Sequence, residues 1–297
     1  MPQVHTNSID IEYEAFGASS DPTILLIMGL SMQMIAWPED FCRDLAARGY
    51  RVVRYDNRDT GFTTKFEGQR APSLRSLFLR RALRWPIRTP YTLEDMADDA
   101  AGLLDSLGID NAHVVGASMG GMIAQNLTAR HPKRVRTLTS IMSTTGHPSL
   151  PGSDPTVTRH VFRARPSGND RESVIAHNMR TLELIGSPSY PVDEEKRREL
   201  ASLSYDRCFY PQGFSRHVAA IFQDGNRRTR LRSVTAPTLV IHGREDPLVP
   251  LAGGVDTAQH VSDARLEIID GMGHNLPIEL WPKIIDLIVE HAKQEQQ

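Results

Sequence analysis

The chain has 297 residues, of which 40% are hydrophobic and 24% charged, and its formal net charge is −2. This balance is ordinary for a globular protein and disfavours general attraction to nucleic acid or to an anionic membrane. Two cysteines far apart in the sequence, Cys42 and Cys208, exclude a framework of disulfides and predict reduced thiols. We find neither a signal-peptide pattern nor an apolar run of the ~18 residues that span a bilayer, and therefore expect a cytoplasmic protein without a membrane span.

Short apolar segments predict strands along the chain, and amphipathic segments predict helices between them. Residues 8–16 alternate polar and apolar side chains, as a half-buried edge strand does, and the run 24–27 is continuously apolar, as in a strand covered on both faces. Further strands are predicted at 51–56, 113–116, 135–142, 238–241 and 266–269, and helices at 37–48, 92–107, 119–130 and from about 277. The alternation predicts an α/β fold with a mostly parallel central sheet flanked by helices.

Two segments interrupt this alternation. Residues 64–90 carry six arginines and form a basic insertion, in which the apolar spacing over 74–85 predicts a basic amphipathic helix. We expect this helix to pack on its own protein, and contact with a membrane surface, the cap or another subunit remains an alternative. Residues 146–234 are rich in proline and arginine without a clear strand, which predicts an inserted helical cap. The core then consists of residues 1–145 and 235–297.

A candidate nucleophile lies in the run Gly116-Ala117-Ser118-Met119-Gly120. A Gly-x-Ser-x-Gly match alone is a weak signal, but here it joins a predicted strand to a predicted helix, which is the arrangement of a nucleophile elbow. Gly116 and Gly120 leave room for a tight turn, and the helix start places N–H donors beside the serine. The sequence therefore predicts that Ser118 is a nucleophile.

The partners of such a serine are expected after later strands, the acid first and then the histidine. Asp246 follows the strand 238–241, and His274 follows the strand 266–269. The sequence thus predicts Ser118, His274 and Asp246 as a catalytic triad. In this triad His274 takes the serine proton, and Asp246 fixes the tautomer of the imidazole.

Three neighbouring residues compete for these roles. Glu245 is the alternative acid, but it points away from the histidine if the loop turns at Pro247. Asp270 lies too close to the end of its strand to face His274, so we interpret it as structural. His242 ends its own strand and is interpreted as a residue that packs or braces the loop.

Two backbone N–H groups should face the oxyanion that forms during acyl transfer. One belongs to Met119, the residue after the nucleophile, and the other to Leu30 in the run Met28-Gly29-Leu30 after the strand 24–27. Gly29 lets this loop turn inward. No histidine or cysteine cluster has the spacing of metal ligands, so neither a metal nor a cofactor is expected.

Together these motifs resemble capped α/β hydrolases close to aclacinomycin methylesterase. The matching runs are 28–30, 37–41, 55–61, 116–121 and 271–274, within a resemblance over about residues 8–145 and 235–292. It implies the α/β-hydrolase fold, the triad Ser118, Asp246 and His274, and an oxyanion hole at Leu30 and Met119. It also implies hydrolysis of a carboxylic ester, with methyl esters among the candidates. Because the family gives no catalytic role to Asp56, Arg58 and Asp59, we interpret them as structural.

The leading prediction is a serine esterase that works through an acyl-enzyme without a cofactor. The same triad would serve a cofactor-free haloperoxidase or perhydrolase, a lactonase or a C–C bond hydrolase, and a ligand receptor could retain it without turnover. An apolar small-molecule ester is the expected substrate, and the chain is a possible homo-oligomer. Apolar side chains of the cap that could line its pocket are Leu182, Leu184, Phe209, Tyr210, Phe214 and Phe222.

Overall fold

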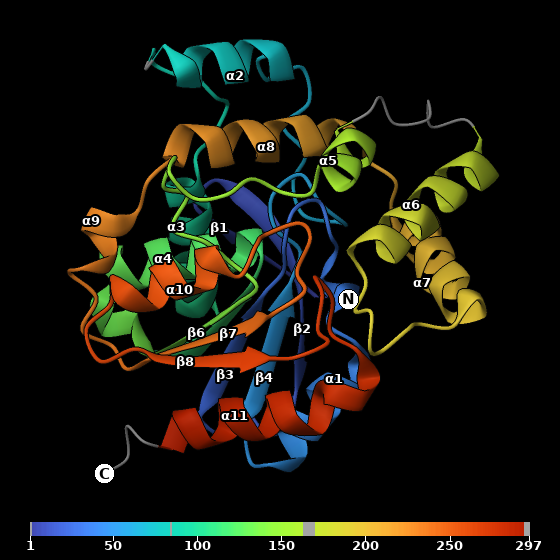
Figure 1. Ribbon diagram of the computed structural model, residues 1–297. Helices are drawn as coiled ribbons and strands as arrows, with labels where there is room; N and C mark the ends of the chain where they lie inside the picture. Colours follow the sequence, from blue (N-terminus) through green and yellow to red (C-terminus); the bar gives the residue numbers. More distant parts are fainter. Residues whose placement is uncertain (1, 84, 163–169, 294–297) are drawn as a thin grey trace.

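The computed structural model describes residues 2–83, 85–162 and 170–293, so Arg84 of the basic insertion lies outside the described residues. Its centre is an eight-stranded sheet in the order β1-β2-β4-β3-β5-β6-β7-β8 (Figure 1). The strands are β1 (Gln3–Thr6), β2 (Ile9–Phe16), β3 (Thr23–Ile27), β4 (Arg51–Tyr55), β5 (Ala112–Ala117), β6 (Val135–Ile141), β7 (Thr238–Gly243) and β8 (Arg265–Ile269). From β4 to β8 all neighbours are parallel, which confirms the predicted sheet.

The interpretation of residues 8–16 as an edge strand was wrong. β2 pairs antiparallel with β1 on one side and with β4 on the other, so β1 forms the edge. The alternation in β2 reflects a buried and a solvated face, because Ile9 and Ile11 are buried while Asp10 is exposed. β1 was missed because its four residues, Gln3 to Thr6, contain a single aliphatic side chain.

Helices cover both faces of the sheet. α1 (Glu39–Ala47) and α11 (Trp281–Lys293) lie on one face, and α3 (Leu93–Ser106), α4 (Met119–Arg130) and α10 (Ala252–Gln259) lie on the other (Figure 1). Alternate residues of β3 pack into the two layers, Ile24 and Leu26 toward α1 and α11, and Leu25 and Ile27 toward α3 and α4. This double burial explains why the strand is continuously apolar. Short 3-10 helices are Met34–Ala36, Pro132–Arg134 and Ile278–Leu280.

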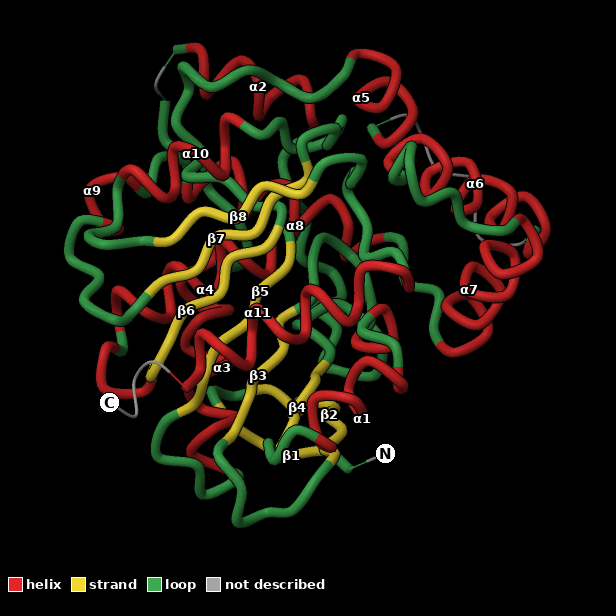
Figure 2. The backbone as a smooth tube through the Cα atoms, turned by 60° about the horizontal axis from the view of Figure 1, so that its bottom comes forward, coloured by secondary structure: helices red, strands yellow, loops and turns green. Residues whose placement is uncertain are grey.

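Between β6 and β7 the described residues form helices and no strand. These helices are α5 (Pro155–Val161), α6 (Arg171–Ile185), α7 (Glu194–Arg207), α8 (Gln212–Asp224) and α9 (Arg228–Leu231). α6 and α7 pack together at one side of the molecule in both views (Figures 1 and 2). α8 lies between the core and α2 (Leu74–Ala82), the helix of the basic insertion (Figure 1). In the described part of the chain, every helix is too short or too polar to cross a membrane.

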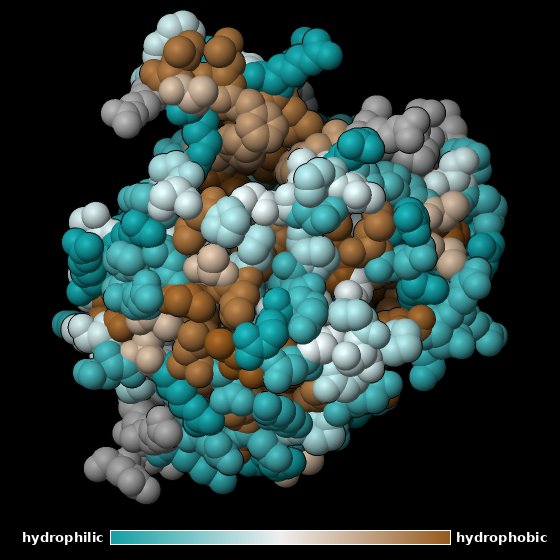
Figure 3. Space-filling model, in the orientation of Figure 1, coloured by the Kyte–Doolittle hydropathy of each residue, from teal (hydrophilic) through white to brown (hydrophobic). Residues whose placement is uncertain are grey.

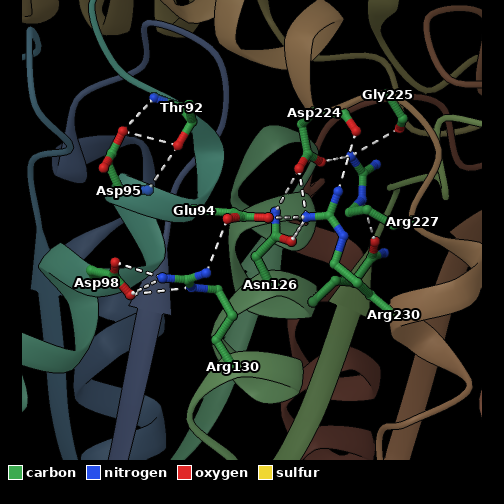
Figure 4. Close-up of polar contacts among 11 residues, drawn as sticks. Thr92, Glu94, Asp95, Asp98, Asn126, Arg130, Asp224, Gly225, Arg227 and Arg230 are labelled. Atoms are coloured by element: carbon green, nitrogen blue, oxygen red, sulfur yellow. Dashed lines mark hydrogen bonds and ion pairs between the residues drawn. The ribbon is translucent and has the colours of Figure 1, made fainter.

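A cluster of charged side chains fastens the end of α8 to the core (Figure 4). Asp224, the last residue of α8, pairs with Arg227 and with Arg230, the latter at 2.7 Å. Arg230 also pairs with Glu94 of α3 at 3.0 Å and donates to Asn126 of α4. Because each buried charge has an opposite charge beside it, the cluster fixes the position of α8 over the core.

Candidate active site

Ser118 occupies a strained turn between β5 and α4, with φ 57° and ψ −120°. Its N–H donates to the carbonyl of Ile141 in β6 at 2.9 Å, which ties the turn to the sheet. A Cβ atom at Gly116 would lie 2.2 Å from the carbonyl oxygen of Gly120, and one at Gly120 would lie 2.0 Å from that of Ile27. Both positions therefore require glycine, and the strain around Ser118 is typical of a functional residue.

We expect Gly120→Ala to lower the free energy of unfolding by about 3 kcal/mol. The added methyl group would clash with the backbone carbonyl of Ile27, and a change of side-chain rotamer cannot relieve this clash. The matched control is Gly152→Ala, since no atom lies within 4 Å of a Cβ at this exposed glycine. Urea denaturation of both variants provides the measurement. Equal stability of the two variants would contradict the tight approach of α4 to β3.

His274 connects Ser118 with Asp246 through two hydrogen bonds. Its Nε2 lies 3.0 Å from Ser118 Oγ, and its Nδ1 lies 2.7 Å from Asp246 Oδ2. The other carboxylate oxygen of Asp246 accepts the N–H groups of Leu248 and Val249 at 2.9 and 2.8 Å. Only 7% of His274 and 6% of Asp246 are exposed. A carboxylate held in this way keeps the proton on Nδ1, which leaves the Nε2 lone pair for the serine hydroxyl.

The alternative acid, Glu245, makes hydrogen bonds to the backbone of the loop after β8. Its Oε2 accepts the N–H of Gly271 at 2.6 Å, and its own N–H donates to the carbonyl of Met272 at 3.1 Å. Glu245 thus joins the loop after β7 to the loop after β8 without contacting the imidazole. Asp270 pairs with Arg244 at the surface.

His242 supports the loop that carries Asp246. It is completely buried, and its Nε2–H donates to the carbonyl of Val249 at 2.8 Å. Burial lowers the pKa of His242, so the imidazole is neutral. Because Val249 also donates its N–H to Asp246, His242 stabilises the turn that holds the carboxylate.

The loop after β3 passes directly beside the serine. A Cβ at Gly29 would lie 3.0 Å from Ser118 Cβ and 3.2 Å from the carbonyl oxygen of Ala117, so a larger residue would have to displace its neighbours. Among the described residues, the N–H groups of Leu30 and Met119 donate to no other protein group. Two such free donors on the segments around the serine are suited to bind an oxyanion.

A histidine that the sequence analysis missed holds this loop. His217 of α8 accepts the N–H of Ser31 on Nδ1 at 3.1 Å and donates its Nε2–H to the carbonyl of Arg58 at 2.8 Å. It is fully buried, and burial lowers its pKa to about 4, so the neutral form that these two bonds require persists at neutral pH. Ser31 follows Leu30, so α8 helps to set the position of the candidate oxyanion donor.

We expect His217 to make the stability sensitive to acid. As the pH falls below 6.5, the unfolded chain binds a proton at this residue, whereas the folded chain does so only near a pKa of about 4. Its contribution is thus present above pH 6.5 and falls by roughly 2 kcal/mol between pH 7 and pH 5. Urea denaturation at both pH values should show a smaller drop for His217→Gln than for the wild type or for the exposed control His5→Gln. Equal drops in all three proteins would refute the prediction.

The loop that carries His274 is held by the residues at the end of α6. The N–H of His274 donates to the carbonyl of Ile185 at 2.7 Å, and that of Gly273 donates to Ser187 Oγ at 2.8 Å. Ser187 in turn donates to Asn275 Oδ1 at 2.6 Å. The position of the candidate base therefore depends on the helices between β6 and β7 as well as on the sheet.

The charged loop after β4 joins these helices to the core. Each of its three charged residues has a buried partner: Asp56 with Arg207, Arg58 with Asp99 and Asp59 with Arg216. Burial alone would raise the pKa of Asp59, but hydrogen bonds from Arg216 and Tyr91 hold it below its usual value. These contacts agree with the structural interpretation of Asp56, Arg58 and Asp59.

An apolar cluster extends from the site into the outer helices. Ile185, Phe214 and Val218 form part of its buried centre, and Leu30 and Leu248 pack against it from the two loops beside the triad residues. Of the six cap residues that we considered for a pocket, Phe214, Leu184 and Phe222 contribute to this cluster. Tyr210 instead accepts a hydrogen bond from Arg216. In the described ranges, no three His, Cys, Asp or Glu side chains are grouped as metal ligands would be.

Known proteins resemble this chain over most of its length. A family model described as alpha/beta hydrolase fold matches residues 22–279. Rhodomycin D methylesterase of Streptomyces sp. strain C5 is 28% identical, and the alignment covers 94% of each chain. 2-Hydroxymuconate semialdehyde hydrolase of Pseudomonas putida is 32% identical over 80% of this chain and 89% of its own.

Solved structures give the same fold. A meta-cleavage product hydrolase from Pseudomonas fluorescens IP01 superimposes with a TM-score of 0.77 at 21% identity, covering 99% of this chain and 98% of the other. An enol-lactonase from Burkholderia xenovorans LB400 gives 0.72 at 23% identity, covering 98% and 99%. These matches confirm the fold and the family that the sequence motifs predicted. With a family match that begins at β3 and continues beyond His274, the chain belongs to the α/β hydrolase fold family.

Proposed function

We propose that this protein is a serine hydrolase that cleaves a carboxylic ester through an acyl-enzyme. The observation that carries the proposal is the hydrogen-bonded series from Asp246 through His274 to Ser118, at 2.7 and 3.0 Å. The free N–H groups of Leu30 and Met119 supply the second requirement of acyl transfer, a site for the oxyanion. The methylesterase name of a relative that matches 94% of the chain supports an ester as substrate.

The proposed reaction has two halves. His274 Nε2 takes the proton of Ser118 Oγ as the oxygen attacks the ester carbonyl, and Leu30 and Met119 N–H stabilise the negative oxygen. His274 then passes the proton to the departing alkoxide, and an alcohol leaves. Water, deprotonated by His274, attacks the acyl-enzyme, which releases the acid and restores Ser118. Asp246 stays ionised throughout and stabilises the imidazolium.

We infer that the substrate is apolar and that residues 146–234 act as a cap over it. The cluster around Phe214 and Val218 reaches Leu30, the candidate oxyanion donor, and Leu248, whose N–H donates to the candidate acid Asp246. Arg207 and Arg216, which contact the loop after β4, are already paired with the buried carboxylates of Asp56 and Asp59. A neutral ester with an apolar acyl or alcohol group therefore suits the surroundings better than an anion.

A panel of p-nitrophenyl esters and alkyl methyl esters tests this proposal. We expect hydrolysis that rises with the apolar character of the acyl group and that is lost in Ser118→Ala. Rates equal to those of Ser118→Ala for every ester would refute the esterase. Such a result together with tight binding of an ester analogue would favour a receptor on the same fold.

Hydrolysis of a C–C bond is the second candidate. It is favoured by the 32% identity to 2-hydroxymuconate semialdehyde hydrolase over 80% of this chain. The same serine and histidine would serve such a reaction. We rank it second because the name of that relative describes a more polar substrate than the apolar cluster suits. Incubation with 2-hydroxymuconate semialdehyde and separation of the products would decide between the two.

A further inference from the structure

The helix of the basic insertion stands on the outside of the molecule. α2 packs on α8 through Leu77, which is fully buried, and through Phe78, whose ring meets that of Phe222 edge-on at 5.0 Å. Among the described residues, no helix or strand lies over the opposite side of α2 (Figures 1 and 2). The helix of the insertion therefore packs on a helix of the predicted cap segment, which was one of the alternatives that the sequence left open, and it does so by one side only.

Large exposed apolar side chains are concentrated on α2 and on the residues that directly follow it. Phe78, Leu79, Leu83 and Trp85 are 52, 55, 48 and 56% exposed. They make up four of the nine large apolar residues that are exposed in the described part of the chain. Figure 3 shows hydrophobic surface gathered on α2 beside hydrophilic side chains. Isolated apolar residues are common on protein surfaces, but a contiguous group marks a contact site.

The same segment carries a concentrated positive charge. Residues 68–93 contain six arginines and no acidic residue, whereas the rest of the chain has 28 basic residues against 36 acidic ones. One end of an acidic protein is thus strongly basic. Such an asymmetry orients the molecule toward a negatively charged partner.

In the described part of the chain, no acidic side chain neutralises the charge of these arginines. In the ranges that the structure describes, Arg70, Arg75, Arg80, Arg81 and Arg88 form no ion pair, in contrast to the paired arginines at the β4 loop and at the end of α8. Arg80 donates to the carbonyl of Pro86 at 2.8 Å, and Arg81 to that of Gly146 at 2.9 Å. Both acceptors are neutral, so the positive charge remains unbalanced. Arg75 and Arg88 are exposed to solvent.

We propose that residues 70–88, with α2 at their centre, dock the protein on the surface of an anionic lipid bilayer. Trp85, Phe78 and the two leucines would enter the boundary between headgroups and acyl chains, and the arginines would contact the headgroup phosphates. A hollow of about 400 Å³ beside Arg81 and Trp85, lined also by Phe222, offers basic and apolar contacts to one lipid. Pairing of two copies through this surface is disfavoured, because it would bring two sets of unpaired arginines together.

Sedimentation with lipid vesicles tests the proposal on the full-length protein. We expect the protein to pellet with vesicles of phosphatidylglycerol and phosphatidylcholine, to stay in solution with phosphatidylcholine alone, and to be released by high salt. Binding should shift the fluorescence of Trp85 to the blue. The other two tryptophans should not respond, because Trp37 is fully buried and Trp281 begins α11, at the opposite end of the molecule from α2 (Figure 1). Absence of pelleting, or equal binding to neutral vesicles, would overturn the proposal.

Two pairs of variants separate charge from apolar contact. Arg75→Gln/Arg88→Gln should weaken partitioning roughly 30-fold, whereas the exposed Arg232→Gln should leave it unchanged. Leu79→Ser/Leu83→Ser should also weaken it, and the matched control is Leu200→Ser/Leu203→Ser on α7, where the leucines are 46 and 51% exposed. Thermal unfolding verifies that every variant is folded. If the α2 variants instead abolish a dimer in sedimentation velocity, the partner is a second copy and the membrane proposal fails.

Discussion

Replacing Ser118 by alanine is expected to lower kcat on the order of 10⁶-fold, as in other enzymes that use a serine triad. The reason is that the acyl-enzyme route ends when its nucleophilic oxygen is removed, while the oxyanion donors and the apolar cluster stay in place. The measurement is the rate of ester hydrolysis at saturating substrate, with thermal unfolding as the check of the fold. A loss of only a few fold would mean that Ser118 is not the nucleophile.

Asp246→Asn should lower kcat on the order of 10⁴-fold, because an amide can donate to Nδ1 and so favour the wrong tautomer of His274. Glu245→Gln is the matched control, since a glutamine oxygen can still accept the N–H of Gly271. We expect the control to keep a rate close to that of the wild type. The assignment of the acid would be wrong if Glu245→Gln lost more activity than Asp246→Asn in the same assay.

The sequence was sufficient for the fold and for the three residues that the structure brings together. Ser118 lies between two glycines in a recognisable motif that follows a short apolar strand, and the loops of Asp246 and His274 also follow short apolar strands. In a parallel sheet the carboxyl ends of the strands lie along one edge, so these loops are expected on the same side of the sheet. The serine motif and the order of acid and histidine then indicate which loops meet. Their roles in catalysis remain predictions until the variants above are measured.

The supporting residues could not be predicted in this way. His217 is hydrogen-bonded to Ser31, which lies 186 residues away in the sequence, and Ser187 is hydrogen-bonded to Gly273, 86 residues away. Both lie in the segment between β6 and β7. Apolar residues recur at helical spacing in α8, as Phe214 and Val218 show, but this spacing does not indicate that His217 faces the loop of Ser31. β1 was missed for a related reason, since its pairing with β2 depends on backbone hydrogen bonds more than on apolar side chains.

Labelling with a fluorophosphonate probe tests the central claim most directly, because the probe reacts with a serine that an adjacent base activates. Intact mass measurement of the native protein, followed by peptide mapping, reports both the number and the position of adducts. We predict a single adduct on Ser118 that is absent from Ser118→Ala and from heat-unfolded protein. An unlabelled native protein, or an adduct on another residue, would contradict the assignment of Ser118 as the nucleophile.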